Sequence, residues 1–317
     1  MSDVILVVTE RLDVTADYVV TELDHRGARV FRFDTAEFPR SMRMNARLDQ
    51  NRSGYIRTSM REVQLSEVGA IYYRRPSIYQ PHPALSPADR AWATREARFG
   101  FGGLLSSLPV WLNHPADIAR AEYKPVQFAA ARVSGLSIMP TLLTNNAKEA
   151  RQFADEFGPI IYKPLSGIHY KHDGGRDFIY TQPVFPDQLD DASVAATTCL
   201  FQQQVIKDHE VRVAVVDGRC FAARIDAHSE RARVDWRADY DSLSYTPTTV
   251  PDIVRDHISR MLRTLRLRFG ALDFAVTPSG QWVWLEINPN GQWAWINELT
   301  PRIASAIADA LEGRTTL

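Results

Sequence analysis

Short apolar runs alternate with amphipathic stretches at the start of the chain. Residues 4–8 (VILVV) are uniformly apolar, which is typical of a strand that is buried on both faces. Over 15–26 apolar residues recur at helical spacing and Gly27 follows, so we expect a helix there. The alternating residues 29–33 (RVFRF) predict a second strand. A strand, a helix and a strand in such close succession predict a parallel βαβ unit.

The following stretch predicts an insertion and then the end of a first domain. Alternation of apolar and polar residues over 42–65 predicts short antiparallel strands, and residues 70–73 (AIYY) predict another strand. We expect a helix over 86–106, because it opens with Ser-Pro, which suits a helix cap and first turn. A strand at 110–112 would close a first domain over residues 1–115.

Two further domains are expected, over 116–200 and 201–317. The first of these contains a helix that includes Lys124 and ends at Gly135. In the second, paired strands flank two turn sequences, Asp217-Gly218 and 278–280 (PSG), and predict β-hairpins. The fold class is therefore α/β with antiparallel elements. The pattern also predicts strands at 141–144, 160–163, 178–181 and 200–205, helices at 146–157, 186–195, 253–267 and 302–311, and a polar, glycine-containing loop at 166–176.

The composition is that of an ordinary globular chain and excludes several classes of protein. Of 317 residues, 45% are apolar and 24% are charged, and 37 basic residues balance 38 acidic ones. This balance gives no reason to expect nucleic acid as a partner. We expect no membrane segment either, because no apolar run approaches the ~20 residues that span a bilayer. The two cysteines, Cys199 and Cys220, cannot build a disulfide framework, which is compatible with a reducing cytoplasm. The first residues do not have the basic character of a signal peptide, so we expect a cytoplasmic protein.

Lysine is rare in this sequence, with 5 lysines against 32 arginines, so each lysine is conspicuous. Lys163 ends an apolar strand and precedes the loop that contains Gly167. An ammonium group flanked by apolar residues is costly unless an anion pairs with it, and backbone amides of such a loop can cradle phosphate. Lys124 lies in an expected helix. The alternative for both lysines is a side chain that simply reaches solvent.

Two carboxylates and an amide are expected to meet on the last predicted hairpin. Glu286 and Asn288 are two residues apart on one strand, so their side chains face the same way. Pairing of the strands would bring Asp273 beside them. Hard oxygen ligands of this kind are those that Mg²⁺ prefers. The alternative is a hairpin with ordinary surface acids.

A polar strand end at 202–205 (QQQV) is followed by Glu210 and Arg212. An extended backbone edge can offer the donor and acceptor that an adenine ring needs, and a carboxylate can bind ribose hydroxyls. A polar strand exit without function is the alternative reading of these residues.

The order of these features resembles that of the ATP-grasp superfamily over residues 124–311. A lysine, a second lysine with a glycine loop, a hinge strand, Glu-x-Arg, Asp and Glu-x-Asn-Pro follow one another in that superfamily. The hinge differs from the common pattern, since Gln203 stands where an acid is often found. The resemblance implies ATP and Mg²⁺ as cofactors, with phosphate contacts from Lys124, Lys163 and the Gly167 loop, an adenine hinge at Gln203, Gln204 and Val205, a ribose contact at Glu210, and Mg²⁺ ligands at Asp273, Glu286 and Asn288.

A narrower resemblance rests on residues 73–76 (YRRP), 235–240 (DWRADY) and 286–293 (EINPNGQW). These motifs resemble those of the ATP-grasp ribosomal peptide maturases, which make the microviridin-like graspetides. That family implies an ATP-grasp fold with an N-terminal βαβ pre-ATP-grasp domain. The motif at 73–76 could instead be a strand that ends in solvated arginines. The motif at 235–240 could instead be a loop that packs around a tryptophan.

The family resemblance also implies a reaction and a partner. A side-chain carboxylate of a ribosomally made precursor peptide, with leader and core, becomes an acyl phosphate, and a hydroxyl or an amine then closes a macrolactone or a macrolactam. Arg74, Arg212 and Arg237 are the candidates to hold the acceptor carboxylate and the acyl phosphate. A homodimer is one assembly that the sequence leaves open. No catalytic base can be assigned, and Asp226, His228 and Asp235 are candidates only.

Two rival functions are compatible with the same nucleotide motifs. One is a carboxylate–amine ligase that acts on a small molecule or a protein tail, as in glutathione synthesis. The other is a nucleotide-binding module without catalysis, against which the presence of both lysines and all three candidate metal ligands argues.

Overall fold

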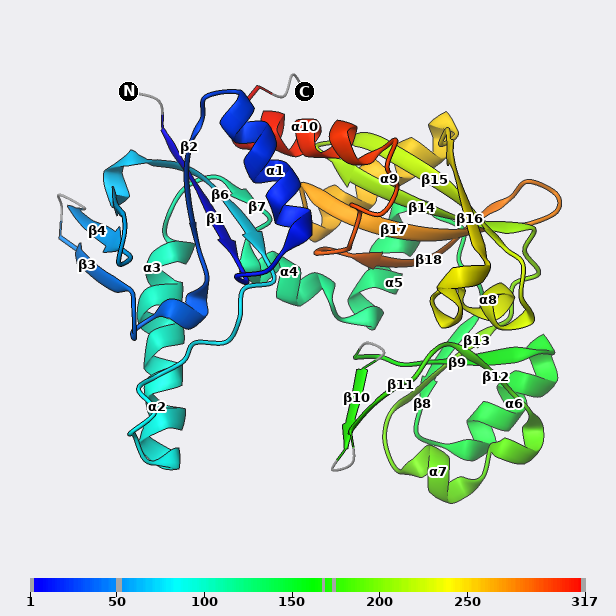
Figure 1. Cartoon of the computed structure of the whole chain (residues 1–317). Helices are drawn as coiled ribbons and strands as arrows, with labels where there is room; N and C mark the ends of the chain where they lie inside the picture. Colours follow the sequence, from blue (N-terminus) through cyan, green and yellow to red (C-terminus); the bar gives the residue numbers. More distant parts are fainter. Residues whose placement is uncertain (1–2, 50–52, 167–168, 173–174, 315–317) are drawn as a thin grey trace.

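The computed structural model describes residues 3–49, 53–166, 169–172 and 175–314 (Figure 1). The chain begins with a parallel sheet of order β2-β1-β6-β7, which confirms the predicted βαβ unit. Alternate residues of β1 are buried on opposite faces, because α1 covers one face and α3 with the inserted strands covers the other. The bounds are β1 Val4–Thr9, α1 Val14–His25, β2 Arg29–Phe33, β6 Val68–Arg74 and β7 Trp111–Leu112.

A three-stranded antiparallel sheet of order β3-β4-β5 is inserted after β2, as the alternation predicted. Its inward residues, including Ile56 and Val63, join the core beside β1. The helix expected over 86–106 is also present, and the Ser86 side chain caps it, although a π turn at Arg98–Gly102 separates α2 from α3. The bounds are β3 Arg43–Arg47, β4 Ser53–Arg57, β5 Glu62–Gln64, α2 Pro87–Ala97 and α3 Gly103–Ser106.

The middle of the chain differs from the expectation in three places. The strand expected over 178–181 is not formed, because β11 (Gly175–Phe178) ends where it should begin and β12 (Gln182–Val184) starts after it. The helix predicted to contain Lys124 is two helices, and Lys124 is the first residue of the second, because Pro125 lacks the N–H that a continuous helix requires. The loop expected over 166–176 contains an antiparallel hairpin of β10 and β11. The remaining strands form a sheet of order β12-β9-β13-β8 that packs on α6 and α7. The bounds are α4 Pro115–Ala121, α5 Lys124–Ser134, β8 Thr141–Thr144, α6 Ala147–Phe157, β9 Ile160–Lys163, β10 His169–His172, β11 Gly175–Phe178, β12 Gln182–Val184, α7 Asp191–Ala195 and β13 Cys199–Gln203.

A five-stranded antiparallel sheet of order β16-β15-β14-β17-β18 fills the C-terminal part. Both predicted hairpins are present, and each turn uses backbone of positive φ, at Asp217 and Gly218 in the first and at Gly280 in the second. The strand β16 was not predicted. The bounds are β14 His209–Val216, β15 Arg219–Ala227, α8 Glu230–Val234, β16 Leu243–Thr248, α9 Asp252–Leu265, β17 Phe269–Val276, β18 Trp282–Asn288 and α10 Thr300–Leu311.

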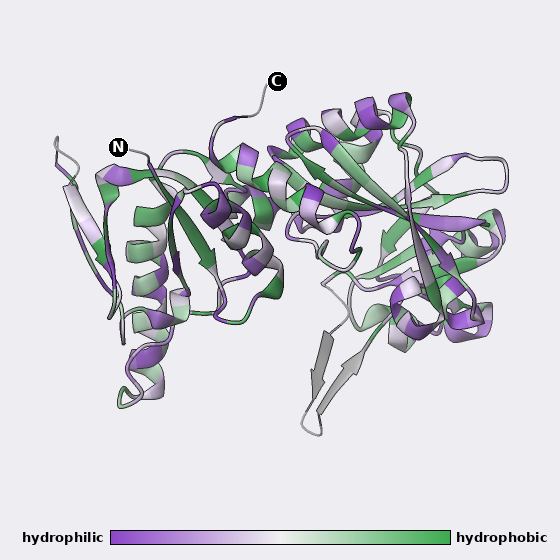
Figure 2. Ribbon diagram, turned by 45° about the horizontal axis from the view of Figure 1, so that its top comes forward, coloured by the Kyte–Doolittle hydropathy of each residue, from purple (hydrophilic) through white to green (hydrophobic). Residues whose placement is uncertain are grey.

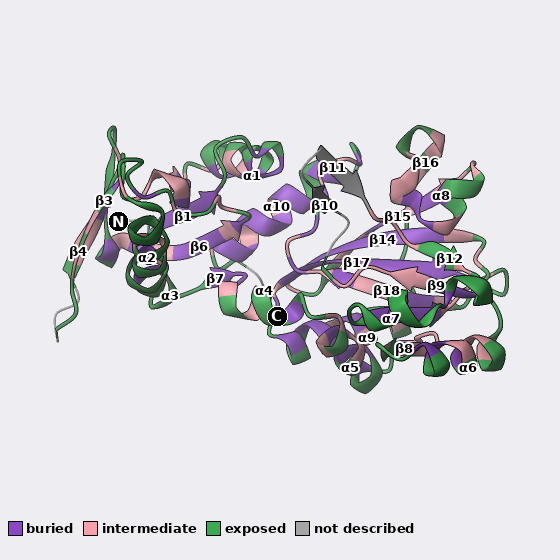
Figure 3. Ribbon diagram, turned by 90° about the horizontal axis from the view of Figure 1, so that it is seen from below, coloured by how far each residue is buried: buried purple, intermediate pink, exposed green. Residues whose placement is uncertain are grey.

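Helices cover the C-terminal sheet on both faces, and this leaves one polar region at its end. On one face α5 and α9 pack on the sheet, and on the other α10 packs with α1. Ala214 and Val216 of β14 lie in the core that includes α10, whereas Glu210 and Arg212 stand at the other end of the same strand. Figure 2 shows hydrophobic residues concentrated on the strands, and Figure 3 shows that β14, β17 and α10 are largely buried. In the described parts of the chain, every helix is too short or too polar to span a bilayer.

Candidate active site

The three predicted metal ligands lie together on β17 and β18. Asp273 pairs directly with Glu286, and Asn288 follows on the same side of β18 while Ile287 between them points into the core. Arg212 of β14 pairs with Asp273 from the opposite neighbour strand. The hairpin that the sequence predicted therefore assembles two carboxylates, one amide and one guanidinium on a single patch of the sheet.

Ion pairs within the chain neutralise both carboxylates of this patch. Lys124 Nζ lies 2.5 Å from Glu286 Oε2, and Arg237 Nη1 lies 2.7 Å from Glu286 Oε1. Burial alone would raise the pKa of Glu286, but Lys124 and Arg237 outweigh it and hold that pKa well below its usual range. Arg212 Nη1 donates to both oxygens of Asp273 at 2.9 Å. The patch is thus a cluster in which carboxylates and cations alternate, although burial raises the pKa of Asp273 against the opposing charge of Arg212.

Lys163 is a further cation beside this cluster, at the end of β9. Its burial lowers the pKa of the ammonium to about 8, although the nearby Glu286 carboxylate acts in the opposite direction and Lys124 adds to the decrease. Among the described residues, none forms an ion pair with Lys163. A half-buried cation of this kind favours an anionic ligand.

The predicted hinge lies where β13 ends and the chain passes to the C-terminal sheet. The amides of Gln203 and Gln204 donate to the carbonyls of Pro140 and Pro159 at 3.0 and 2.8 Å, and the Gln203 side chain donates to Phe157 O at 2.9 Å. The Gln203 side chain is therefore occupied within the chain and turned towards α6. Gln203 is thus held by the chain itself and does not offer the side-chain contact that an acid often makes at this position.

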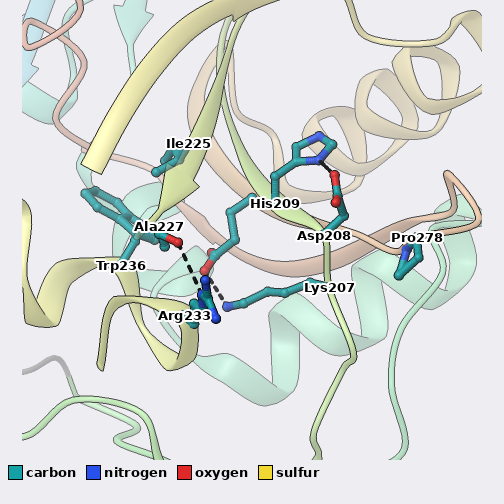
Figure 4. Close-up of a pocket in the computed structure, with 9 residues that line it drawn as sticks. Lys207, Asp208, His209, Ile225, Ala227, Arg233, Trp236 and Pro278 are labelled. Carbon is teal, nitrogen blue, oxygen red and sulfur yellow. Dashed lines mark hydrogen bonds and ion pairs between the residues drawn. The ribbon is translucent and has the colours of Figure 1, made fainter. Parts of the chain in front are cut away.

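A pocket of about 310 Å³ opens just beyond this hinge (Figure 4). At its wall, Lys207 Nζ lies 2.5 Å from Glu210 Oε1. Burial raises the pKa of Glu210, while the Lys207 ammonium opposes that increase. The size is that of a small-ligand pocket. The residues that line it are Lys207, Asp208, His209, Glu210, Ile225, Ala227, Arg233, Trp236 and Pro278.

Arg237 links the segment after β15 to β18, the strand that carries two of the candidate metal ligands. Its Nε lies 3.0 Å from Asp235 Oδ1, and its guanidinium also lies 5.7 Å from the ring centre of Trp236. Asp235 is buried and also accepts from the N–H groups of Thr181 and Arg237 at 3.1 and 3.2 Å. These bonds fix Arg237, and together with the Arg237 charge they hold the pKa of Asp235 below its usual value despite its burial, which makes Asp235 a weak base.

The other two candidate bases also have partners in the structure. Asp226 accepts from Arg224 Nε at 2.8 and 2.9 Å, and His228 Nε2 lies 3.1 Å from Ser244 Oγ. The structure brings neither of them into the cluster around Glu286. No candidate base therefore emerges from this set.

Arg74 has a setting that the sequence did not suggest. Its side chain is 2% exposed, and its Nε lies 3.0 Å from Asp13 Oδ2. Its Nη2 donates to Gln292 Oε1 at 2.5 Å, and its Nη1 lies 3.4 Å from the Gly291 carbonyl. Arg74 therefore fastens β6 to the turn that follows the candidate metal ligands. The guanidinium is enclosed by the chain's own acceptors.

Gln292 lies in the motif at 286–293, but the sequence did not indicate a role for its side chain. Its side chain accepts from Arg74 and from Thr15, while its carbonyl accepts from Arg212 Nη2 at 3.1 Å. Gly291 must be glycine here, because a Cβ at that position would lie 2.7 Å from Arg212 Nη2 and 2.3 Å from a neighbouring Cβ. Gly167 of the predicted phosphate loop lies outside the described residues.

The donor set fits ATP and Mg²⁺ in its chemistry. Two carboxylates and the amide Asn288 supply hard oxygen atoms, which Mg²⁺ prefers, and Lys124 and Lys163 supply cations for phosphate. The described residues contain no cluster of three His, Cys, Asp or Glu side chains, so the amide is needed to complete three protein ligands.

Residues 4–119 match the family described as the MvdD pre-ATP grasp domain. The whole chain is also similar to solved structures. A RiPP-associated ATP-grasp ligase of Chryseobacterium gregarium, in complex with ADP and a leader and core peptide, is 27% identical with a TM-score of 0.92, covering 99% of this chain and 98% of that chain.

Two macrocyclases of Microcystis aeruginosa MRC are also similar over nearly their full lengths. MdnC, bound with its precursor peptide MdnA, is 28% identical with a TM-score of 0.85, covering 98% of this chain and 100% of that chain. MdnB is 29% identical with a TM-score of 0.80, covering 98% and 99%. No curated protein matches the chain. The N-terminal match and the full-length similarity together show an ATP-grasp ligase with an N-terminal pre-ATP-grasp domain, similar over its whole length to RiPP-associated ATP-grasp ligases.

Proposed function

We propose that this ligase activates Asp or Glu side chains of a ribosomal precursor peptide with ATP and joins them to Ser, Thr or Lys side chains. The observation that carries the proposal is the cluster in which Lys124 and Arg237 meet Glu286 while Arg212 meets Asp273. The cluster supports the proposal because it brings cations suited to phosphate and to carboxylate beside the candidate metal ligands. Similarity to ligases that bind leader and core peptides supports a peptide as the substrate.

The nucleotide would lie between the hinge and the cluster. The hinge at Gln203, Gln204 and Val205 leads into the pocket where Glu210 stands, which suits adenine and then ribose. Lys124 and Lys163 would bind the phosphates, together with the loop that contains Gly167. Bound Mg²⁺, on Asp273, Glu286 and Asn288, would supply charge neutralisation for the transferred phosphoryl group.

The acceptor carboxylate would lie against Arg237 and Arg212. Arg237 is fixed by Asp235, so its remaining N–H groups have a defined direction. The carboxylate attacks the γ-phosphate and gives an acyl phosphate and ADP. The hydroxyl or amine of the peptide then attacks the acyl carbon, phosphate leaves, and one water is lost per bond in the peptide. Of the two possible products, we expect an ester rather than an amide.

Arg74 has a different role in this proposal from the acceptor contact that the sequence suggested. Its enclosed guanidinium would position the turn at 290–292, and so Gln292, which also holds Arg212. Arg74 would thus act on the acceptor site through Arg212 without touching the substrate.

The organisation and surroundings are part of the same proposal. We divide the chain into a pre-ATP-grasp domain at 1–115, a central subdomain at 116–200 and a C-terminal subdomain at 201–317. The enzyme would act in the cytoplasm, where a ribosomal peptide is made, without nucleic acid or membrane as a partner. A homodimer is a further proposal, and light scattering of the purified protein tests it.

The proposed function predicts a short reading frame rich in Thr and in Asp or Glu beside the gene, and the peptide that such a frame encodes is the substrate for the test. With ATP and Mg²⁺ the peptide should lose one water mass per bond, and one ADP should form for each. Esters should open in mild base, whereas amides should survive. A peptide that gained mass or lost none would refute the macrocyclase, and ADP release with small amines and acids would then indicate a small-substrate ligase.

A further inference from the structure

Two buried amide side chains hold the strands that carry the candidate metal ligands. Gln127 lies on α5 and Asn113 follows β7, and each is 2% exposed. Both bond to backbone atoms of β17 or β18, or to residues that directly adjoin these strands. Neither belongs to the residues assigned above to ATP, Mg²⁺ or the peptide.

Gln127 holds the residue between two of the ligands. Its Nε2 donates to Ile287 O at 2.9 Å, and its Oε1 accepts from Ile287 N–H at 3.3 Å. The N–H belongs to the peptide group that joins Glu286 to Ile287, and the carbonyl belongs to the group that joins Ile287 to Asn288. One amide therefore fixes both peptide planes, and with them the directions in which Glu286 and Asn288 project.

The same side chain fixes the helix that carries the phosphate lysine. Gln127 is three residues after Lys124, so the two lie on one side of α5. Its Nε2 also donates to Ala121 O, at 2.7 Å, which ties the end of α4 to the same point. The position of Lys124 relative to Glu286 is thus set by one buried amide.

Asn113 joins the start of β17 to the end of β18. Its Oδ1 accepts from the N–H groups of Arg268 and Phe269 at 2.8 and 3.0 Å. Its Nδ2 donates to Phe269 O at 2.8 Å and to Pro289 O at 3.2 Å. All four hydrogen-bonding positions of the amide are used. Since β17 carries Asp273 and Pro289 follows Asn288, Asn113 sets the spacing between those ligands.

We propose that Gln127 and Asn113 are positioning residues for the metal site, an inference that rests on the proposed function. Loss of either amide would also lower stability, because it would leave buried backbone groups without a hydrogen-bond partner. What the amides add is a fixed direction for each peptide group. Groups behind metal ligands act in this way, and their loss commonly weakens metal binding about 10–100-fold.

The test is the binding of Mn²⁺, followed by electron paramagnetic resonance, to the full-length protein in the presence of ADP. Gln127→Met keeps the length of the side chain and removes all three bonds. We expect Mn²⁺ to bind about tenfold more weakly or worse, while the affinity for ADP measured without metal stays as in the wild type. Asn113→Ala should likewise weaken Mn²⁺ binding and leave the affinity for ADP without metal unchanged.

Two comparisons separate positioning from loss of stability. Ile258→Val trims a buried side chain of the core that α5 and α9 share, so it should lower Tm and leave Mn²⁺ affinity unchanged. Gln127→Glu keeps an acceptor for Ile287 N–H and loses the donors, so it should weaken Mn²⁺ binding even if the Met variant does not fold.

The outcomes distinguish this inference from the metal assignment beneath it. Folded Gln127→Met and Gln127→Glu proteins that bind Mn²⁺ as the wild type does would overturn the positioning role. Wild-type Mn²⁺ affinity in Glu286→Ala would instead overturn the metal assignment itself. Weaker Mn²⁺ binding by a Gln127 variant, with wild-type Mn²⁺ binding by Ile258→Val, would support the inference.

Discussion

Replacement of Arg237 by alanine tests the proposed acceptor site most directly. The guanidinium lies 2.7 Å from Glu286 and 3.0 Å from Asp235, and the Arg237 and Glu286 side chains are 27% and 20% exposed. Partial exposure screens the pair with Glu286, and the buried Asp235 keeps its two backbone donors, which limit the cost of losing Arg237. We therefore expect a loss of about 1–2 kcal/mol in the free energy of unfolding, which a folded protein of this size tolerates.

The effects on binding and on product should go in different directions. Without Arg237, Glu286 has one cation fewer to compete with Mg²⁺, so the affinity for Mg²⁺–ADP should be unchanged or higher. Product formation should fall about 10²–10³-fold, which is the usual cost of one donor that stabilises a developing anion. The combination of intact nucleotide binding and lost coupling is the expected signature of an acceptor residue.

Calorimetry with Mg²⁺–ADP and mass spectrometry of the peptide measure the two effects separately. Arg231→Ala, which removes an exposed arginine from the nearby α8, should leave both at the wild-type level. A wild-type rate of product formation in Arg237→Ala would refute the role of Arg237. A parallel fall in Mg²⁺–ADP affinity and product would instead assign Arg237 to the nucleotide.

Three further predictions concern the nucleotide side of the site. Glu286→Ala and Asn288→Ala should abolish ADP release and leave the fold intact, since both side chains lie at the last polar positions of β18 and are only partly buried. Circular dichroism and an ADP assay check this, and wild-type ADP release by either variant would contradict the metal assignment. Lys163→Ala should abolish turnover in the same assay. Because burial lowers the pKa of Lys163 to about 8 and bound phosphate would raise it, ADP binding above that pH should take up a proton and weaken as the pH rises. Calorimetry in buffers of different ionisation enthalpy measures this uptake, and a Lys163→Arg protein, which stays charged, should lack it.

The sequence predicted the elements that depend on local chemistry. The hairpins at Asp217-Gly218 and at Gly280 were found because their turns need positive φ, and alternation on their strands placed Glu286, Asn288 and Asp273 together. The break before Lys124 was also readable, since Pro125 is incompatible with a continuous helix, but it was missed.

The features that the sequence could not predict depend on contacts between distant segments. Arg74 was expected to meet substrate, yet it meets residues 290–292, more than 200 positions away, and no local pattern distinguishes a buried guanidinium from a free one. Gln127 and Asn113 were likewise invisible, because their partners are backbone atoms, which leave no trace in side-chain identity. Tertiary packing decides all three.

A charge count over the cluster explains why Lys163 differs from its neighbours. Lys124, Arg212 and Arg237 are paired with the carboxylates of Glu286, Asp273 and Asp235, so three cations face three anions. Lys163 is then one cation in excess, held where burial disfavours its charge. Each paired cation can exchange a carboxylate for a phosphate or an acceptor carboxylate at little electrostatic cost, because one anion replaces another. Among the described residues, Lys163 has no such partner to give up, so an incoming phosphate gains most from this residue, and its loss should weaken nucleotide binding more than loss of Lys124.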